Sequence, residues 1–218
     1  MRIARFSLNG EPKFGIVDGP ELVVLNGHPL VAGYDTTGER IPIKDVKLLA
    51  PTIPSKVVCV GLNYADHAAE SGAPIPKEPI IFMKAISCIQ GPNDPVMLPK
   101  GSVKSDWEVE LGIVIGTRAR YVTQKAALEH DAGYCTINDV SEREYQIERG
   151  PQWDKGKGCD TFGPIGPWLV TPDEVGNVQR LDMWLDLNGK RVQTGNTRTM
   201  IFDVAKIVSY LSEFMTLM

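Results

Sequence analysis

Two glutamates stand two residues apart in a stretch that otherwise predicts a β-strand. Glu108 and Glu110 alternate with apolar residues that continue to Ile115. Side chains alternate between the faces of a strand, so both acids project from one face, with Cβ atoms roughly 6.5 Å apart. At an effective dielectric constant of 20 their carboxylates repel by about 2 to 3 kcal/mol. A divalent cation such as Mg²⁺, Mn²⁺ or Ca²⁺ would remove this repulsion. The alternative is an edge strand whose polar face meets water.

A metal site normally needs a third protein ligand, and Asp139 is the best candidate for it. This aspartate ends a second predicted strand, residues 134–139, from which its carboxylate can reach a neighbouring strand. The alternative is that Asp139 caps the N-terminus of a helix that follows it. The sequence leaves both interpretations open.

A histidine with a carboxylate partner is predicted on a short helix over residues 64–71. Tyr64, His67 and Glu70 follow one another at steps of three and therefore share one helical face. A carboxylate beside an imidazole fixes its tautomer and raises its basicity, which prepares it to activate water. The alternative is an ion pair on a solvated helix surface. His28 and His130 have no comparable partner and are interpreted as surface residues.

Lys157 is the candidate for a positively charged side chain at the site. It stands between Gly156 and Gly158, and glycines allow the backbone to approach a ligand closely. This spacing favours a loop that wraps around a bound molecule. The alternative is a flexible surface loop.

The elements that must position these residues divide the chain near residue 52. Residues 1–52 contain short β-type segments with an Asn9-Gly10 turn, which predicts a small β-rich domain. Residues 41–55 contain three prolines and are predicted to be a crossing linker. Residues 53–218 then form the larger domain that carries all the candidate site residues.

The larger domain mixes strands and helices without regular alternation. We expect a strand over 57–60, the helix over 64–71 with Asn63 as its N-cap, and a hairpin at Asn188-Gly189. The segment 141–150 is predicted to be a short helix or a loop, and an amphipathic helix is expected from about 201 to 214. Irregular alternation argues against a doubly wound parallel sheet and predicts an α+β fold with an antiparallel or mixed sheet.

Composition excludes several function classes. The chain has 218 residues, 43% of them hydrophobic and 23% charged, with a net charge of −4. Nothing in this balance attracts nucleic acid or anionic lipid, and no apolar run reaches the roughly 18 to 20 residues of a membrane span. The four cysteines form no C-x-x-C pair, which is typical of free thiols in a reducing cytosol. We expect a cytoplasmic protein.

Several stretches together resemble the fumarylacetoacetate hydrolase family. They span residues 55 to 217 in the family's order and include GLNYADHAAE, IIFMKAIS, GPNDPV, DWEVELGIVIG, GYCTINDVSEREYQ, KGKGCDTFGPIGPWLV and GNTRTMIFDVAKIVSYLSEFMTL. Within the family the sequence is most similar to bacterial 2,4-diketo-3-deoxy-L-fuconate-type hydrolases, whose subgroup also carries the name ureidoglycolate lyase. The resemblance implies a mixed β-sheet roll with a small N-terminal domain, assembled as a homodimer.

The resemblance also implies roles for individual residues. Glu108, Glu110 and Asp139 would ligate Mg²⁺ or Mn²⁺, in agreement with the strand pattern. A water-activating pair would be formed by His67 and Glu70, and Lys157 would face the substrate. The remaining positions that the resemblance assigns to substrate binding are Tyr64, Arg143 and Gln146.

The activity implied is hydrolysis of a carbon–carbon bond in a 2,4-diketo acid of the acylpyruvate type, derived from a sugar acid, with release of pyruvate. Alternatives are a decarboxylase, lyase or isomerase that uses the same enolate chemistry, a non-catalytic relative, and a simple cation-binding β module. Family members continue beyond the position of Met218 with a segment that completes the sheet. We therefore expect the C-terminal part of the roll to be missing from this chain.

Overall fold

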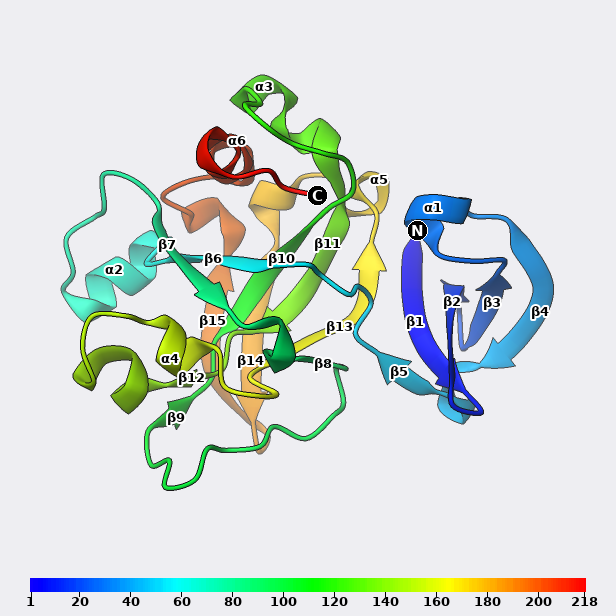
Figure 1. The fold of residues 1–218 in the computed structure, drawn as a ribbon, viewed down its shortest axis with the longest axis horizontal. Helices are drawn as coiled ribbons and strands as arrows, with labels where there is room; N and C mark the ends of the chain where they lie inside the picture. The colour runs from blue at the N-terminus through cyan, green and yellow to red at the C-terminus, as the bar shows by residue number, and fades with distance from the viewer.

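The computed structural model describes residues 1–218 and has a large, mainly antiparallel sheet with helices around one half of it (Figure 1). Nine strands form this sheet, in the order β10-β11-β13-β1-β2-β3-β4, with β5 paired to β1 and β8 paired in parallel to β13. The predicted α+β class with a mixed sheet is confirmed. The strands of this sheet are β1 (Arg2–Leu8), β2 (Glu11–Asp18), β3 (Glu21–Leu25), β4 (Thr36–Pro42), β5 (Lys47–Leu49), β8 (Ile89–Gln90), β10 (Val109–Ile115), β11 (Asp131–Asn138) and β13 (Gly163–Val170).

The N-terminal strands lie at one end of the molecule and continue the sheet of the larger half. The hairpin between β1 and β2 turns at Asn9 and Gly10, whose φ angles of 52° and 87° are those of a tight hairpin turn. β1 also pairs with β13, so the two halves share hydrogen bonds. The predicted linker over 41–55 is partly wrong, because it includes the end of β4 and the whole of β5. The division near residue 52 stays a prediction.

Three two-stranded ladders accompany the main sheet. β6 (Val57–Gly61) pairs with β7 (Ile80–Lys84), and β9 (Ser105–Asp106) pairs with β12 (Ser141–Glu142). The third is the hairpin of β14 (Asp182–Leu187) and β15 (Lys190–Asn196), which turns at Asn188-Gly189 as predicted. The helices and helical turns are α1 (Pro29–Ala32), η1 (Ile43–Asp45), α2 (Ala65–Ser71), η2 (Ile86–Cys88), α3 (Gln124–Ala127), η3 (Leu128–His130), η4 (Glu144–Glu148), α4 (Asp154–Lys157), α5 (Pro172–Val175), η5 (Val178–Arg180), η6 (Thr197–Thr199) and α6 (Val204–Phe214).

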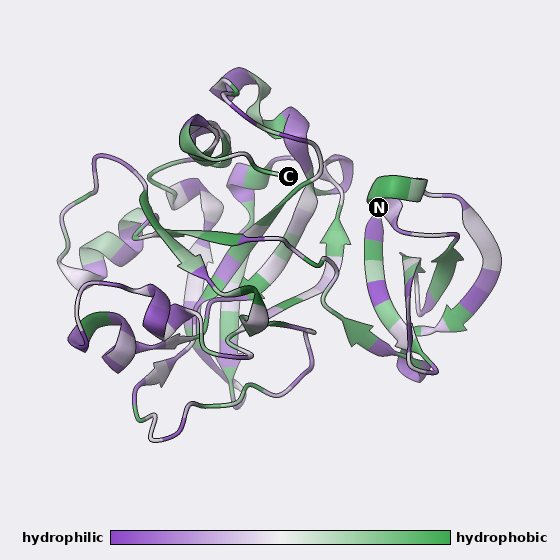
Figure 2. Ribbon diagram, in the orientation of Figure 1, coloured by the Kyte–Doolittle hydropathy of each residue, from purple (hydrophilic) through white to green (hydrophobic).

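The main core lies between α6 and the strands β6, β10 and β11. Apolar residues of α6 recur at helical spacing and are buried against those strands, whose apolar segments Figure 2 shows. The carboxylate of Asp203 accepts the amide of Lys206 at 2.7 Å and caps the helix. The helix therefore begins at Val204, three residues after its predicted start. A second, smaller core holds the N-terminal strands together.

The predicted role of Asn63 is wrong. Helix α2 begins after Tyr64, and Asn63 does not cap it. Instead, the Asn63 side chain accepts the amide of Phe202 at 2.9 Å and donates to the Phe202 carbonyl at 3.0 Å. Asn63 thus ties the start of α2 to the loop that leads into α6. This contact fixes the segment that carries His67 beside the C-terminal helix.

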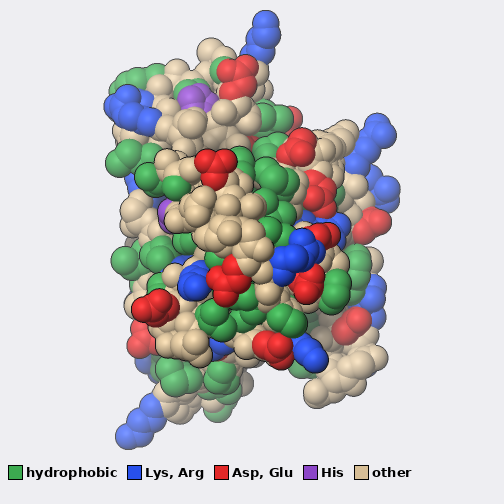
Figure 3. Space-filling model, turned by 90° about the vertical axis from the view of Figure 1, so that its right-hand side faces the viewer, with side chains coloured by type: hydrophobic (Ala, Val, Ile, Leu, Met, Phe, Trp, Pro, Cys, Tyr) green, Lys and Arg blue, Asp and Glu red, His purple; other side chains and the backbone are tan.

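No helix of the protein is both long and apolar enough to cross a membrane. Acidic and basic side chains are interspersed on the face that carries the N-terminal strands (Figure 3). All four cysteines are free.

Candidate active site

The register between β10 and β11 brings two of the predicted acids together. The pairing of Val109 with Asn138 continues by one residue, because the amide of Asp139 donates to the carbonyl of Glu108 at 2.8 Å. Directly opposed residues of an antiparallel pair share a face of the sheet. Glu108 and Asp139 therefore face the same side as Glu110, which lies two residues along β10. The alternative that Asp139 caps a helix is wrong, because its carboxylate binds two lysines instead.

Lys157 lies between these acids. Its Nζ atom donates to Glu108 Oε2 at 2.5 Å and to Asp139 Oδ2 at 2.8 Å. It extends from α4, a short helix rather than the predicted loop, and is 2% exposed. The carboxylate of Asp154 accepts the amide of Met83 at 2.8 Å and anchors this helix to β7. A side chain at Gly156 would collide with the Glu142 carbonyl, so glycine is required for this close packing.

A second buried lysine, Lys84, was missed in the sequence. It ends β7 and donates to Asp139 Oδ1 at 2.7 Å and to the Val140 carbonyl at 3.1 Å. Burial alone would raise the pKa of Asp139, but the Lys84 and Lys157 ammonium groups hold it below its ordinary value. The burial of Lys84 could have been predicted from the strand pattern, because Lys84 lies on the same face of β7 as the buried Phe82.

Arg143 and Gln146, the two positions near the acids for which substrate binding is predicted, lie at the same corner as Glu108. Arg143 Nη2 donates to Glu108 Oε1 at 2.6 Å, and Arg143 Nη1 donates to Gln146 Oε1 at 2.9 Å. Arg143 also binds Asp106, a partner that was missed in the sequence. The π-helical turn η4, which replaces the predicted helix or loop, holds Gln146 in a buried position. The guanidinium therefore has a fixed orientation beside the acids.

Glu110 differs from the other two acids because no cation binds it. Burial first, and then the nearby carboxylates of Glu108 and Asp139, raise the pKa of Glu110 to about 8. As the side chains stand, no group of three His, Cys, Asp or Glu residues could hold a metal ion. Lysine and arginine nitrogens pair with the oxygens of Glu108 and Asp139. The donor set itself, three carboxylates on one face of the sheet with one of them unpartnered, is of the kind that a hard divalent cation prefers.

The raised pKa of Glu110 predicts a pH dependence of stability in protein treated with a chelator. An unfolded glutamate titrates at about 4.3, so the folded state binds more protons between that pH and about 8. The free energy of unfolding should therefore fall as pH rises through this window and level off above it. Thermal melting from pH 5 to pH 8 should show the wild type losing stability relative to Glu110→Gln. A difference between the two proteins that is constant with pH would contradict the assignment.

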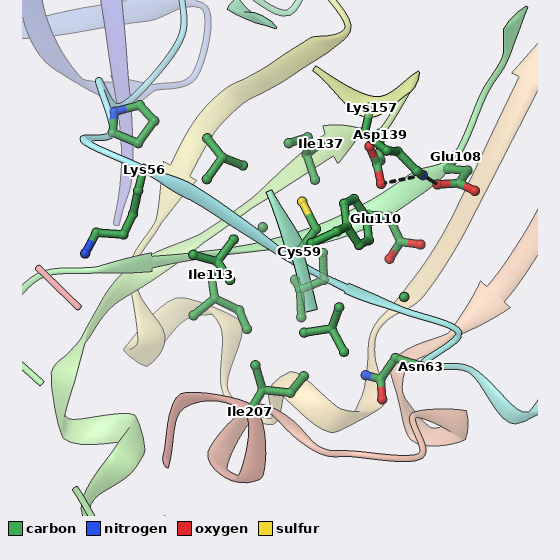
Figure 4. Close-up of a pocket in the computed structure, with 18 of the residues that line it drawn as sticks. Lys56, Cys59, Asn63, Glu108, Glu110, Ile113, Ile137, Asp139, Lys157 and Ile207 are labelled. Carbon is green, nitrogen blue, oxygen red and sulfur yellow. Dashed lines mark hydrogen bonds and ion pairs between the residues drawn. The ribbon is translucent and has the colours of Figure 1, made fainter. Parts of the chain in front are cut away.

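The site lies at one end of a cavity of about 770 Å³ (Figure 4). Every predicted site residue except Glu70 lines it. Beyond the acids the walls are largely aliphatic, and Lys56 lies at the far end, where its Nζ donates to the Thr216 carbonyl at 2.5 Å. Aliphatic residues of this part include Val58, Val60, Ile113, Ile137 and Ile207. The cavity thus has a charged end and an apolar body.

The predicted pair of His67 and Glu70 is not assembled. Both residues lie on α2 and are exposed, and no hydrogen bond joins them. His67 lines the cavity, whereas Glu70 does not. Tyr64 precedes the helix, and burial, followed by the negative charge of Glu110, raises the pKa of its phenol. The structure therefore places Tyr64 in the cavity wall within the electrostatic influence of Glu110, and it leaves His67 as a cavity-lining residue without its partner.

Comparison with known proteins identifies relatives over the whole chain. The family described as "Fumarylacetoacetate (FAA) hydrolase C-terminal" matches residues 56–218, and the one described as "Rv2993c-like, N-terminal" matches residues 1–51. A Burkholderia multivorans protein named "Putative hydrolase" is 65% identical over all of this chain and 83% of its own length.

Two solved structures extend the comparison. The 2-hydroxyhepta-2,4-diene-1,7-dioate isomerase from Mycobacterium marinum is 37% identical, with a TM-score of 0.89 over all of this chain and 83% of that one. The maleylpyruvate hydrolase from Sphingobium sp. SYK-6 is 28% identical, with a TM-score of 0.80 over all of this chain and 84% of that one. It is in complex with a manganese(II) ion and pyruvate.

Proposed function

Because the chain belongs to the fumarylacetoacetate hydrolase family, we propose that it is a divalent-metal-dependent hydrolase that cleaves a 2,4-diketo acid and releases pyruvate. One observation carries the proposal: Glu108 and Asp139 meet Lys157 at the charged end of the cavity, and Glu110 lines the same cavity without an ion-pair partner. The manganese and pyruvate in the maleylpyruvate hydrolase structure support it. Glu108, Glu110 and Asp139 would hold Mg²⁺ or Mn²⁺. The cation would act as a Lewis acid toward the oxygens of the α-keto acid.

Residues of this chain would orient the substrate at the charged end. The guanidinium of Arg143 and the amide of Gln146 lie beside the acids and would bind oxygens of the keto acid. Lys157 would stabilise the negative charge that develops on the pyruvate half when the carbon–carbon bond breaks. The bulk of the substrate would then extend along the apolar body of the cavity.

Hydrolysis requires a water molecule and a base. His67 lines the cavity and would remove a proton from water while the water oxygen attacks the C4 carbonyl carbon. The C3–C4 bond then breaks, its electrons pass to the enolate of pyruvate, and a proton returns to C3. Glu70 would have to approach His67 to orient it, because the two side chains are not hydrogen-bonded. The acyl half leaves as a carboxylic acid.

The cavity walls bear on the choice of substrate. A polyhydroxylated sugar-acid chain needs many hydrogen-bond partners, and the aliphatic residues beyond the acids offer few. We therefore favour an acylpyruvate with an apolar acyl group over the sugar-acid derivative that the resemblance implies. Homodimer formation stays a prediction.

A panel of substrates tests the proposed function. Acylpyruvates of increasing chain length, 2,4-diketo-3-deoxy sugar acids and oxaloacetate should each be incubated with Mg²⁺ or Mn²⁺, and pyruvate measured. The expected result is pyruvate from the acylpyruvates, lost on addition of a chelator. If no diketo acid yields pyruvate, or if the chelator has no effect, the proposal is wrong.

A metal-dependent isomerase is the second candidate, favoured by the separation of His67 from Glu70 and by the Mycobacterium marinum isomerase. Replacing His67 with alanine separates the two functions. If His67 is the base that activates water, hydrolysis should fall by about a hundredfold or more. Isomerisation of an enol acid needs no attacking water and should be unaffected. Full hydrolytic turnover by His67→Ala, measured as pyruvate release, would remove His67 from the mechanism.

A further inference from the structure

We propose that Lys157 is a built-in counter-ion that a divalent cation must displace, so that cation binding releases the Lys157 ammonium group into the cavity. The inference rests on the proposed function, which assigns a cation to Glu108, Glu110 and Asp139. It adds a coupling between the cation, Lys157 and the substrate, which would determine when the site can bind the cation and the substrate together.

The oxygens of Glu108 and Asp139 are all occupied by donors from the protein. Arg143 binds Glu108 Oε1 at 2.6 Å, and Lys84 binds Asp139 Oδ1 at 2.7 Å. The remaining oxygen of each acid binds the Nζ atom of Lys157, at 2.5 Å and 2.8 Å. A cation that bridges these two acids would need oxygens at about 2 Å, which places it where this ammonium group now lies. The ammonium group and the cation cannot both be bound there.

Lys157 is the donor whose displacement opens the site with the least rearrangement. Its Nζ atom is the one nitrogen shared by Glu108 and Asp139, so a single movement frees an oxygen on each acid. Lys84 does not line the cavity, and Arg143 binds only one of the two acids. Lys157 does line the cavity, beside the ring of Phe82 at 5.1 Å. The released ammonium group therefore has space in the cavity.

The displacement links the cation to an anionic substrate. Once released, the ammonium group can pair with a carboxylate in the cavity, and a carboxylate that attracts it also empties the cation position. Coupling of this kind is reciprocal, so each ligand should tighten the binding of the other by the same factor. The lysine thus favours a site that holds both ligands or neither.

Calorimetric titration of Mn²⁺ into metal-free protein, without any substrate, tests the displacement directly. The proteins compared are the wild type, Lys157→Met and Lys155→Met. Lys155 is an exposed residue of the same helix and contacts none of the acids, so its variant serves as the control. Because Mn²⁺ no longer has to displace a bound charge, Lys157→Met should bind it roughly tenfold more tightly than the wild type. Lys155→Met should bind it as the wild type does. Affinity in Lys157→Met that is equal to or weaker than wild type would overturn the proposal.

Two further proteins keep the result interpretable. Lys157→Gln retains an amide donor to the acids. This variant replaces Lys157→Met if the methionine variant does not fold. Lys157→Gln should also bind Mn²⁺ more tightly than the wild type does. Glu110→Gln should bind Mn²⁺ weakly or not at all, which places the cation at this site. If the wild type and Lys157→Gln both fail to bind Mn²⁺, the cation assignment and the displacement are both overturned. If the wild type binds through Glu110 but the lysine variants gain nothing, only the displacement is overturned.

Discussion

Replacing Glu110 with glutamine is expected to lower the turnover of an acylpyruvate by about a thousandfold or more, because a cation contributes several kcal/mol to transition-state stabilisation and about 1.4 kcal/mol corresponds to tenfold. Glutamine has nearly the same shape but offers no negative charge. Glu110 has no ion-pair partner that would be left unpaired, so the variant should fold normally. Steady-state assays of pyruvate release at saturating Mn²⁺ measure the loss.

A matched control distinguishes this effect from a general loss of negative charge. Glu129 is exposed in η3 and does not line the cavity, so Glu129→Gln should keep wild-type turnover. Chelator-treated Glu110→Gln should melt at or above the wild-type temperature at pH 8, because it lacks a buried carboxyl group that is forced to ionise. Retained activity in a folded Glu110→Gln protein would show that this carboxylate does not serve the reaction.

Replacing Lys157 with methionine is expected to reduce turnover by roughly a hundredfold or more, the usual effect of removing one preorganised charge-stabilising donor. The reason is that the Lys157 ammonium group, which pairs with Glu108 and Asp139 in the structure, would supply the positive charge that stabilises the pyruvate half once the cation has released it. The same variant should bind Mn²⁺ more tightly than the wild type. Tighter cation binding together with slower turnover is not expected from a residue whose role is only structural.

Lys155→Met is the control for the kinetic experiment too. It lies two residues from Lys157 on the same helix and should retain full turnover. Measurement of kcat and KM for both variants separates the two roles of Lys157. A loss confined to KM would indicate that Lys157 only binds the substrate, and a loss below threefold in kcat/KM would remove it from the reaction.

The acidic corner could be predicted from the sequence because strand geometry determines it. The alternation around Glu108 and Glu110 places both on one face, and the register with β11 extends that face to Asp139. Both Asn-Gly hairpins were predictable for the same local reason, since these residues adopt positive φ angles readily. The shared face of the acids and the Asn-Gly turns can be predicted because they depend mainly on residues that are close in the sequence.

The lysine network could not be predicted so well because it depends on contacts that are distant in the sequence. Lys84 reaches Asp139 across 55 residues, and Asn63 binds Phe202 across 139. Asn63 before a helix favours an N-cap locally, yet two hydrogen bonds to a distant loop decide its conformation. The spacing of His67 and Glu70 likewise predicts a shared helical face, but it does not determine whether the two side chains meet.

Diffraction from crystals grown with Mn²⁺, collected for anomalous scattering of manganese, tests the central claim most directly. An anomalous peak is expected at about 2 Å from carboxylate oxygens of Glu108, Glu110 and Asp139, with the Lys157 ammonium group moved away from the two acids that it now joins. Absence of a peak at these residues, with Lys157 still bound between Glu108 and Asp139 at saturating Mn²⁺, would contradict the claim that this corner of the sheet is a metal centre.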